Sequence, residues 1–146
     1  MKPRGDADPQ PHVIRLRGRW SLTAQHLGEV RAPVDLASLF AESPQRDLQL
    51  RRRFGCPSNL DPNERVELVI DPLDAAGDVS LNAQPLGPLA PAPVATRFDV
   101  TLLLQPRNEL LLDLRPPREQ GSFPMLDVRL EIFELSRSKP WSGDSK

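Results

Sequence analysis

Arginine is the residue type whose spacing most suggests chemistry in this sequence. Three consecutive arginines open the segment RRRFGCPSNL at 51–60, directly before the only cysteine, Cys56. A guanidinium binds carboxylates and phosphates through two hydrogen bonds, so this segment could hold an anionic ligand. Nearby arginines could also favour the reactive thiolate of Cys56. We favour a simpler interpretation, in which the segment is the end of a strand, its alternate arginines face solvent or acids on a neighbouring strand, and the cysteine is structural.

Three aspartates, Asp71, Asp74 and Asp78, lie close together in the segment DPLDAAGD. Carboxylates and loop carbonyls are the ligands that calcium prefers, so these residues are candidates for a structural calcium site, although their spacing matches no established calcium loop. The surrounding Pro, Ala and Gly indicate a solvated turn rather than a catalytic carboxylate pair. His12 and His26 have no neighbour at metal-ligand spacing. We therefore predict no catalytic residues, no zinc and no cofactor.

Length and composition limit the class of protein. A chain of 146 residues fits one domain, and 17 prolines with 8 glycines suit short strands joined by turns rather than long helices. The net charge of -1 provides no general attraction for nucleic acid. The segment 1–11 lacks the apolar run of a secretory signal, and a lone cysteine cannot form an internal disulfide, so we expect a reducing cytoplasmic location. No apolar stretch is long enough for a membrane span.

Alternating patterns assign the arginines to strands. The segment HVIRLRGRWSL at 12–22 is predicted as one strand. Its inner residues are Ile14, Leu16 and Trp20, and its outer residues are Arg15, Arg17 and Arg19. The segment RDLQLRRRF at 46–54 places Arg51 and Arg53 outside and Arg52 inside. We expect Arg52 to be satisfied by a buried acid such as Glu67 or by extending to water at the rim of the sandwich.

If these two strands are neighbours, their outer arginines form a stripe able to hold a carboxylated sugar or a phosphate. We favour the alternative that they pair with acids on neighbouring strands. The candidate acids are Asp47, Glu67, Asp127, Glu131 and Glu134.

Five further segments alternate in the same way: ERVELVID, GDVSLNAQPLG, RFDVTLLLQ, NELLLDLR and MLDVRLEIFEL. A turn is predicted at Asn82, Ala83 and Gln84, and a short helix after Pro33. About seven short strands with regular turn signals predict an all-β, antiparallel sandwich over 12–135. The segments 1–11 and 136–146 are predicted as a disordered lead-in and a flexible tail.

The order of these segments carries a resemblance. RLRGRW, RRRF, RVELVID and DVSLNAQPLG are followed by FDVTLLLQPRNELLLDL, and together they resemble the amino-terminal jelly-roll domain of glycoside hydrolase family 2 enzymes such as β-galactosidases and β-glucuronidases. The most specific matches are Asp99, Val100, Thr101, Asn108 and Leu110. The resemblance covers residues 12–134, with Asn82-Ala83 in place of the family's Asn-Gly turn and without its catalytic barrel. It implies a galactose-binding-like sandwich and a connection with sugars.

We therefore predict a stand-alone, non-catalytic binding or interaction module whose ligand is a protein partner or a glycan. One alternative is a carbohydrate or anionic-sugar binding protein that uses Asn82, Arg51 and Arg53, and a second is an accessory subunit of a glycoside hydrolase. Hydrolase activity is implied by the resemblance alone. Aromatic rings are few, with Trp20 predicted in the core and Trp141 in the tail, which disfavours stacking on sugars. Exposed rings or a cleft at the strand ends would favour a sugar as the ligand. A flat apolar sheet face or an uncovered edge strand would favour a protein partner.

Overall fold

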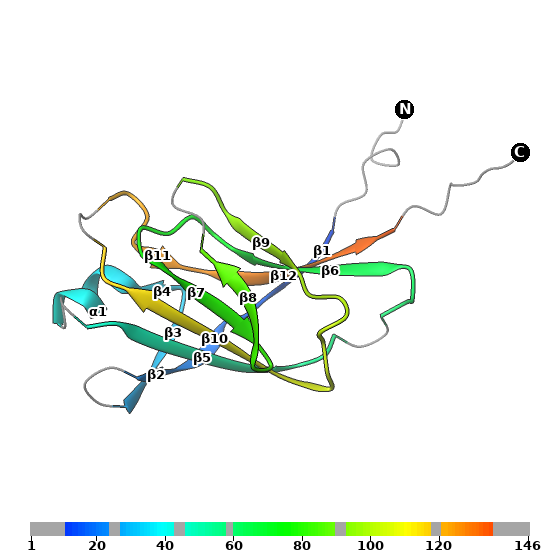
Figure 1. Cartoon of the computed structure of the whole chain (residues 1–146), viewed down its shortest axis with the longest axis horizontal. Coiled ribbons are helices and arrows are strands. Elements are labelled where there is room, and N and C mark those ends of the chain that lie inside the picture. Colours follow the sequence, from blue (N-terminus) through cyan, green and yellow to red (C-terminus); the bar gives the residue numbers. More distant parts are fainter. Residues whose placement is uncertain are drawn as a thin grey trace, which may run out of the picture.

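The architecture was determined from a computed structural model, which describes residues 11–23, 27–42, 46–57, 60–89, 93–117 and 121–135. Two antiparallel sheets pack face to face, and one short helix lies at one end of them (Figure 1). The predicted antiparallel jelly-roll β-sandwich is confirmed. The predicted lead-in and tail, apart from Pro11, lie outside the described residues. No helix within the described ranges is long and apolar enough to cross a membrane.

The two large sheets contain most of the strands. The four-stranded sheet has the order β1 (His12–Arg15), β12 (Val128–Glu134), β6 (Glu64–Ile70) and β9 (Thr96–Asp99). The six-stranded sheet has the order β3 (Leu27–Ala32), β2 (Gly18–Thr23), β5 (Leu48–Gly55), β10 (Arg107–Arg115), β7 (Ala76–Leu81) and β8 (Gln84–Pro88). A two-stranded sheet near the helix α1 (Leu36–Glu42) consists of β4 (Val34–Asp35) and β11 (Met125–Leu126).

The core lies between the large sheets, because the strands turn alternate apolar residues toward one another. Buried residues include Leu110, Leu112 and Leu114 of β10 and Val66, Leu68 and Ile70 of β6. Trp20 is also buried, as predicted, and its ring N–H donates a hydrogen bond of 3.0 Å to the carbonyl of Leu16. That bond satisfies the polar atom that a buried tryptophan carries.

The segment at 12–22 is two strands, and the prediction of a single strand is wrong. The chain leaves the four-stranded sheet after β1 and enters the six-stranded sheet at Gly18, whose φ of +87° suits glycine. Ile14, Leu16 and Trp20 still face the core, but they do so from different parts of the sandwich. The corner preserves the alternation, so the pattern alone could not reveal it.

The predicted strand RFDVTLLLQ also ends early, at Asp99. The Asp99 carboxylate accepts hydrogen bonds from the hydroxyl (2.6 Å) and the backbone N–H (3.0 Å) of Thr101, which closes a turn. The hydroxyl hydrogen bond is the main reason that the pKa of Asp99 is lowered. The backbone N–H of Val66 donates to the Thr101 hydroxyl at 2.9 Å, so the turn is attached to β6. The chain beyond it is a loop rather than a strand.

The predicted turn and helix are both present. Asn82 and Ala83 have φ values of 54° and 66° and join β7 to β8, as in a type I′ hairpin turn, whereas Gln84, expected in the turn, is the first residue of β8. The helix α1 begins after Asp35, whose carboxylate accepts hydrogen bonds from the backbone N–H (3.2 Å) and the hydroxyl (2.9 Å) of Ser38.

Candidate functional site

The predicted site residues Arg53 and Asn82 line one pocket at an end of the six-stranded sheet. β5 ends there, β10 begins there, and the turn between β7 and β8 lies beside them. The pocket has a volume of about 610 Å³, and Phe54, Arg107 and Glu109 also contribute to its lining. The sandwich therefore has a cleft at its strand ends, which was one of the two features expected of a sugar-binding site.

The two asparagines of this pocket are occupied by contacts within the protein. Asn82 uses both N–H groups of its amide, one to the Leu103 carbonyl at 3.0 Å and one to the Asn108 side-chain oxygen at 2.9 Å. Its oxygen accepts the backbone N–H of Glu109 at 2.8 Å. Asn108 is 2% exposed, and its amide makes further hydrogen bonds with Gln105. Both amides therefore position the turn and the loop, and neither offers a free N–H to a ligand.

The two outer arginines of β5 share one carboxylate. Glu109 Oε2 lies 3.2 Å from Arg53 Nε and 3.5 Å from Arg51 Nε. Cross-strand pairing was the favoured prediction, but Glu109 was not among the acids proposed. The sequence did not reveal that β5 and β10 are neighbours, with Arg53 and Glu109 in register. The Arg53 side chain remains 78% exposed, so this ion pair contributes less than about 1 kcal/mol to the free energy of unfolding.

Arg52 does not bind Glu67, so the expectation of a buried acid is wrong. The Arg52 guanidinium donates hydrogen bonds to the Arg17 carbonyl from Nε (3.1 Å) and Nη2 (2.7 Å), and a third to the Arg53 carbonyl. Arg17 lies where the chain crosses from one sheet to the other, so Arg52 attaches this crossing to β5. Glu67 lies in the other sheet and binds Arg97 instead.

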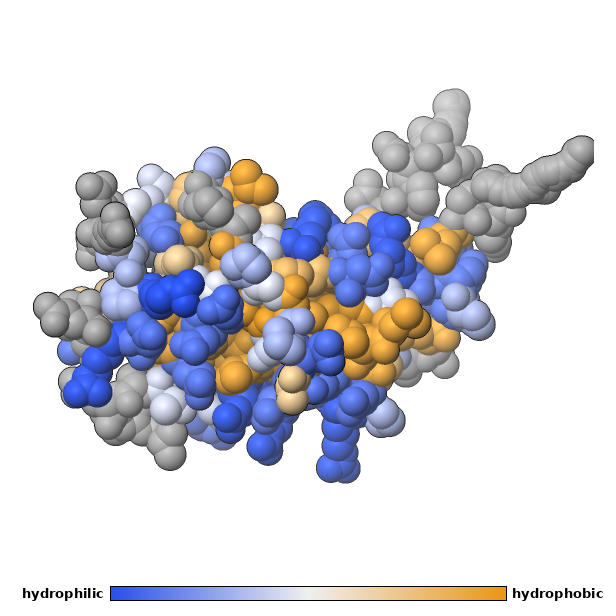
Figure 2. Space-filling model, in the orientation of Figure 1, coloured by the Kyte–Doolittle hydropathy of each residue, from blue (hydrophilic) through white to orange (hydrophobic). Residues whose placement is uncertain are grey.

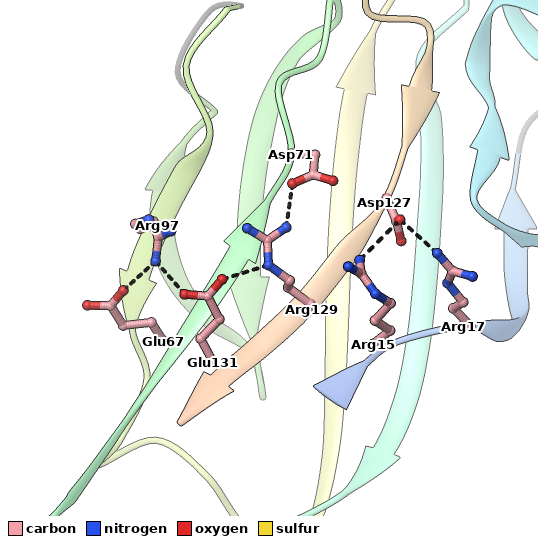
Figure 3. Close-up of polar contacts among 8 residues, drawn as sticks. All are labelled: Arg15, Arg17, Glu67, Asp71, Arg97, Asp127, Arg129 and Glu131. Carbon is pink, nitrogen blue, oxygen red and sulfur yellow. Dashed lines mark hydrogen bonds and ion pairs between the residues drawn. The ribbon is translucent and has the colours of Figure 1, made fainter. Parts of the chain in front are cut away.

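A network of ion pairs covers the outer side of the four-stranded sheet (Figure 3). We call it the charge-paired face, and it consists of Glu67, Asp71, Arg97, Arg129 and Glu131. Glu131 is 6% exposed and accepts hydrogen bonds from Arg97 (2.8 Å) and Arg129 (2.7 Å), while Arg97 also binds Glu67 at 3.0 Å and Arg129 also binds Asp71. Burial alone would raise the pKa of Glu131, but the two guanidinium hydrogen bonds outweigh it and lower that pKa.

The arginines of the first segment separate between the two sheets. Arg15 and Arg17 lie 3.5 and 3.3 Å from Asp127 Oδ2, one of the acids proposed from the sequence (Figure 3). Arg19 lies in the six-stranded sheet, 3.8 Å from Glu29. The prediction that these three arginines share the face of one strand is therefore wrong, because the segment forms two strands.

The three aspartates proposed for calcium have separate partners. Asp71 binds Arg129, Asp78 binds Arg115 at 3.1 Å, and Asp74 accepts two backbone N–H groups from the loop that precedes β11. Within the described ranges, no three His, Cys, Asp or Glu side chains are grouped to hold a metal ion. The calcium proposal thus has no site in this part of the chain.

The aromatic rings and the thiol of the described residues are buried or half-buried. Trp20 and Phe40 are buried, and the other rings are half-buried: Phe54, Phe98, Phe123 and Phe133. No ring among the described residues is fully exposed, and the ring that lines the pocket at the strand ends, Phe54, is half-buried, so these rings offer little surface for stacking on a sugar. Cys56 is half-buried, and its backbone N–H donates to the Pro106 carbonyl at 3.1 Å.

A second pocket, of about 280 Å³, lies at the opposite end of the six-stranded sheet. α1 and the segments that follow β10 and precede β11 surround it, and most of its lining is apolar, including Leu36, Phe40 and Phe123. Its one acid is Asp74, which is held by the backbone contacts described above.

Comparisons with known proteins concern the fold. No protein-family model matches the sequence, and no curated protein matches it. The chain shares its fold with bacterial glycosidases. The FMN-binding β-glucuronidase from Faecalibacterium prausnitzii L2-6 is similar with a TM-score of 0.68 at 16% identity, over 84% of this chain and 22% of that enzyme. The β-D-mannosidase from Dictyoglomus thermophilum is similar with a TM-score of 0.62 at 19% identity, over 73% of this chain and 16% of that enzyme.

A third glycosidase has the same fold. The Bifidobacterium dentium β-glucuronidase is similar with a TM-score of 0.63 at 23% identity, over 74% of this chain and 21% of that enzyme. The expected jelly-roll fold of the glycoside hydrolase family 2 amino-terminal domain is therefore confirmed. The chain spans less than a quarter of each of these three enzymes, so most of each enzyme has no counterpart in this sequence.

Proposed function

We propose that this chain is a non-catalytic interaction module that binds a protein partner at the end of the sandwich where Leu102 and the Arg53–Glu109 pocket lie. The observation that carries the proposal is Leu102, which is 96% exposed, whereas Leu103 and Leu104 pack against the core. Burial of this side chain by a partner would be favourable by about 1.5–3 kcal/mol.

The loop that carries Leu102 is held at both ends. Thr101 is bonded to Asp99 and to β6, and the Leu103 carbonyl accepts the 3.0 Å hydrogen bond from Asn82. Leu102 is therefore pre-positioned, and binding would cost little additional loop entropy. A glycoside hydrolase catalytic chain is the partner class that the fold suggests, which makes an accessory subunit one specific form of this proposal.

Binding of an anionic sugar in the pocket is the second candidate function. It is supported by the exposed guanidinium of Arg53 and by Arg107, which line the pocket at the strand ends. Two guanidinium groups there could contact the carboxylate of a uronic acid. We place it second because Asn82 and Asn108 are occupied and because no described ring is exposed.

The first experiment is a quantitative capture from native extract with three immobilised forms: the unmodified protein, Leu102→Asp and Val94→Asp. Val94 is a matched control because it is a 61% exposed apolar residue on another loop. We expect the same proteins to be retained by the unmodified protein and by Val94→Asp and lost by Leu102→Asp. Equal retention by all three forms contradicts a Leu102 interface.

A glycan array at low and raised salt tests the second function. Saturable binding that persists at raised salt and disappears in Arg53→Ala would make sugar binding the primary function. Hydrolysis of a chromogenic glucuronide by the purified protein would overturn the non-catalytic assignment.

A further inference from the structure

One end of the outer side of the six-stranded sheet carries more guanidinium groups than carboxylates. We call it the arginine face, and it contains Arg31 of β3, Arg19 of β2, Arg51 and Arg53 of β5, and Arg107 of β10. These residues point to one side because they occupy alternate or directly paired positions on neighbouring strands. The carboxylates among them are Glu29 and Glu109.

Two of these arginines oppose each other. Arg19 and Arg31 are direct partners in the register of β2 and β3, and like charges in such a pair destabilise a sheet. Arg19 has Glu29 at 3.8 Å, and Arg31 has no ion-pair partner among the residues that the structure describes. On electrostatic grounds we expect this arrangement not to stabilise the fold.

Three of the arginines form a row that leads to the pocket. Ser21 of β2 pairs with Arg51 of β5. Because the two strands are antiparallel, Arg19, two residues before Ser21, and Arg53, two residues after Arg51, both lie on the side of this pair that is nearer the pocket. Neighbouring strands are about 4.8 Å apart, so the row of Arg31, Arg19 and Arg53 is about 10 Å long.

The guanidinium groups of the row are accessible, and an apolar surface lies beside them. The side chains of Arg53 and Arg19 are 78% and 68% exposed. Figure 2 shows hydrophilic side chains projecting from the edge along which β5 runs in Figure 1, and apolar atoms gathered over the loop between β9 and β10. Leu102 belongs to this loop, and Asn82 joins the loop to the pocket that Arg53 lines.

We propose that the arginine face and Leu102 together bind an extended acidic segment of a partner protein. Carboxylates of that segment contact Arg31, Arg19 and Arg53, and one of its apolar side chains packs on Leu102. This inference rests on the proposed function, because it names the chemistry of the partner that binds at this end of the sandwich.

An acidic peptide fits these observations better than another polyanion. A polysaccharide would find no exposed ring among the described residues and would leave Leu102 unused. The net charge of the whole chain is -1, so the attraction is local and is screened beyond about 10 Å at 0.1 M salt. Nucleic-acid binding by contrast depends on many phosphate contacts along a basic surface.

The test is fluorescence anisotropy with a labelled peptide of glutamate and aspartate that contains one central leucine. A length of about twelve residues spans both the row and the loop when extended. We expect saturable binding at low salt, weakened about tenfold by Arg31→Glu and also by Leu102→Asp. Arg31→Glu should fold normally, because it replaces the like-charge pair with an opposite-charge pair. Arg115→Glu, on the same sheet face at its other end, is the matched control and should leave the affinity unchanged within about twofold.

Several results would overturn the inference. They are no binding of the peptide, equal weakening by Arg31→Glu and Arg115→Glu, and binding of oligogalacturonate or single-stranded DNA at least as tight as that of the peptide. Self-association in sedimentation that Arg31→Glu abolishes would instead identify a second copy of this chain as the occupant. A further outcome is that the peptide does not bind while Leu102→Asp still fails to capture the proteins that the unmodified protein retains from extract. That result would overturn the acidic peptide as the partner's chemistry and leave the proposed interaction module supported.

Discussion

The two outer faces of the sandwich are both rich in charge, and they differ in how that charge is compensated. On the charge-paired face, Arg97 and Arg129 each contact two carboxylates (Figure 3). On the arginine face, Arg51 and Arg53 share one carboxylate, and Arg19 opposes Arg31. Charges that are paired and partly buried hold strands together, whereas exposed and uncompensated charges remain available to another molecule. The difference separates a structural surface from a candidate binding surface.

The largest expected effect comes from breaking the charge-paired face. Glu131→Gln leaves Arg129, whose side chain is 17% exposed, with one carboxylate fewer, and should lower the free energy of unfolding by about 3 kcal/mol. Glu109→Gln, the equivalent change on the arginine face, should cost less than about 1 kcal/mol. Urea denaturation of both variants measures the difference. Equal costs would show that the two faces do not differ in this way.

Acid should next weaken the charge-paired face and the turn that Asp99 closes. Glu131 and Asp99 have lowered pKa values in the folded protein, so the stability they contribute is complete above their ordinary values of 4.5 and 3.8 and is lost as the pH falls below them. We expect the free energy of unfolding to decline below about pH 4.5 through these groups. The decline should be shallower in Glu131→Gln. An identical pH dependence in the variant and the unmodified protein would remove Glu131 from the explanation.

A smaller contrast is expected between adjacent arginines. Arg52→Ala removes the hydrogen bonds to the Arg17 carbonyl and should lower the free energy of unfolding by about 1–2 kcal/mol. Arg53→Ala removes a surface ion pair and should cost less than about 1 kcal/mol. The midpoints of chemical denaturation compare the two. If both midpoints are unchanged, Arg52 does not stabilise the crossing between the sheets.

The smallest effect has the opposite sign. Arg31→Thr removes the repulsion from Arg19 and places a residue that favours strands on β3, so it should raise the free energy of unfolding by a few tenths of a kcal/mol. Thermal unfolding at low salt measures this gain, and the gain should shrink at raised salt because salt screens the repulsion. A loss of stability would show that Arg31 contributes to the fold after all.

Most strands were predictable because successive side chains of a strand point to opposite faces of the sheet, so buried and exposed residues alternate along the sequence. This identified β5, β6, β10 and β12, and their inner residues form the core. The same rule failed at 12–22, where the corner keeps the alternation, and after Asp99, where three leucines continue an apolar run into a loop. The Asp-x-Thr spacing at 99–101 was a signal for that turn, because such side chains bond to nearby backbone N–H groups.

The candidate site was only partly predictable. Arg53 and Asn82 were identified, and the structure places them in one pocket. Leu102 was missed, because its exposure depends on where the strand stops. Asn108, which carries part of the family resemblance, is buried with its amide bonded to Asn82 and Gln105, so this part of the resemblance marks a folding element rather than a ligand contact.

The sequence by itself determined the class of fold, the apolar residues that fill the core and the turn at Asn82. These properties depend on local alternation and on the preferences of single residues. Only the tertiary structure decided which charges meet: Glu109 with Arg51 and Arg53, Glu131 with Arg97 and Arg129, and Arg31 with no acid among the described residues. Cross-strand neighbours depend on sheet order and register, and these are set by packing between segments far apart along the chain.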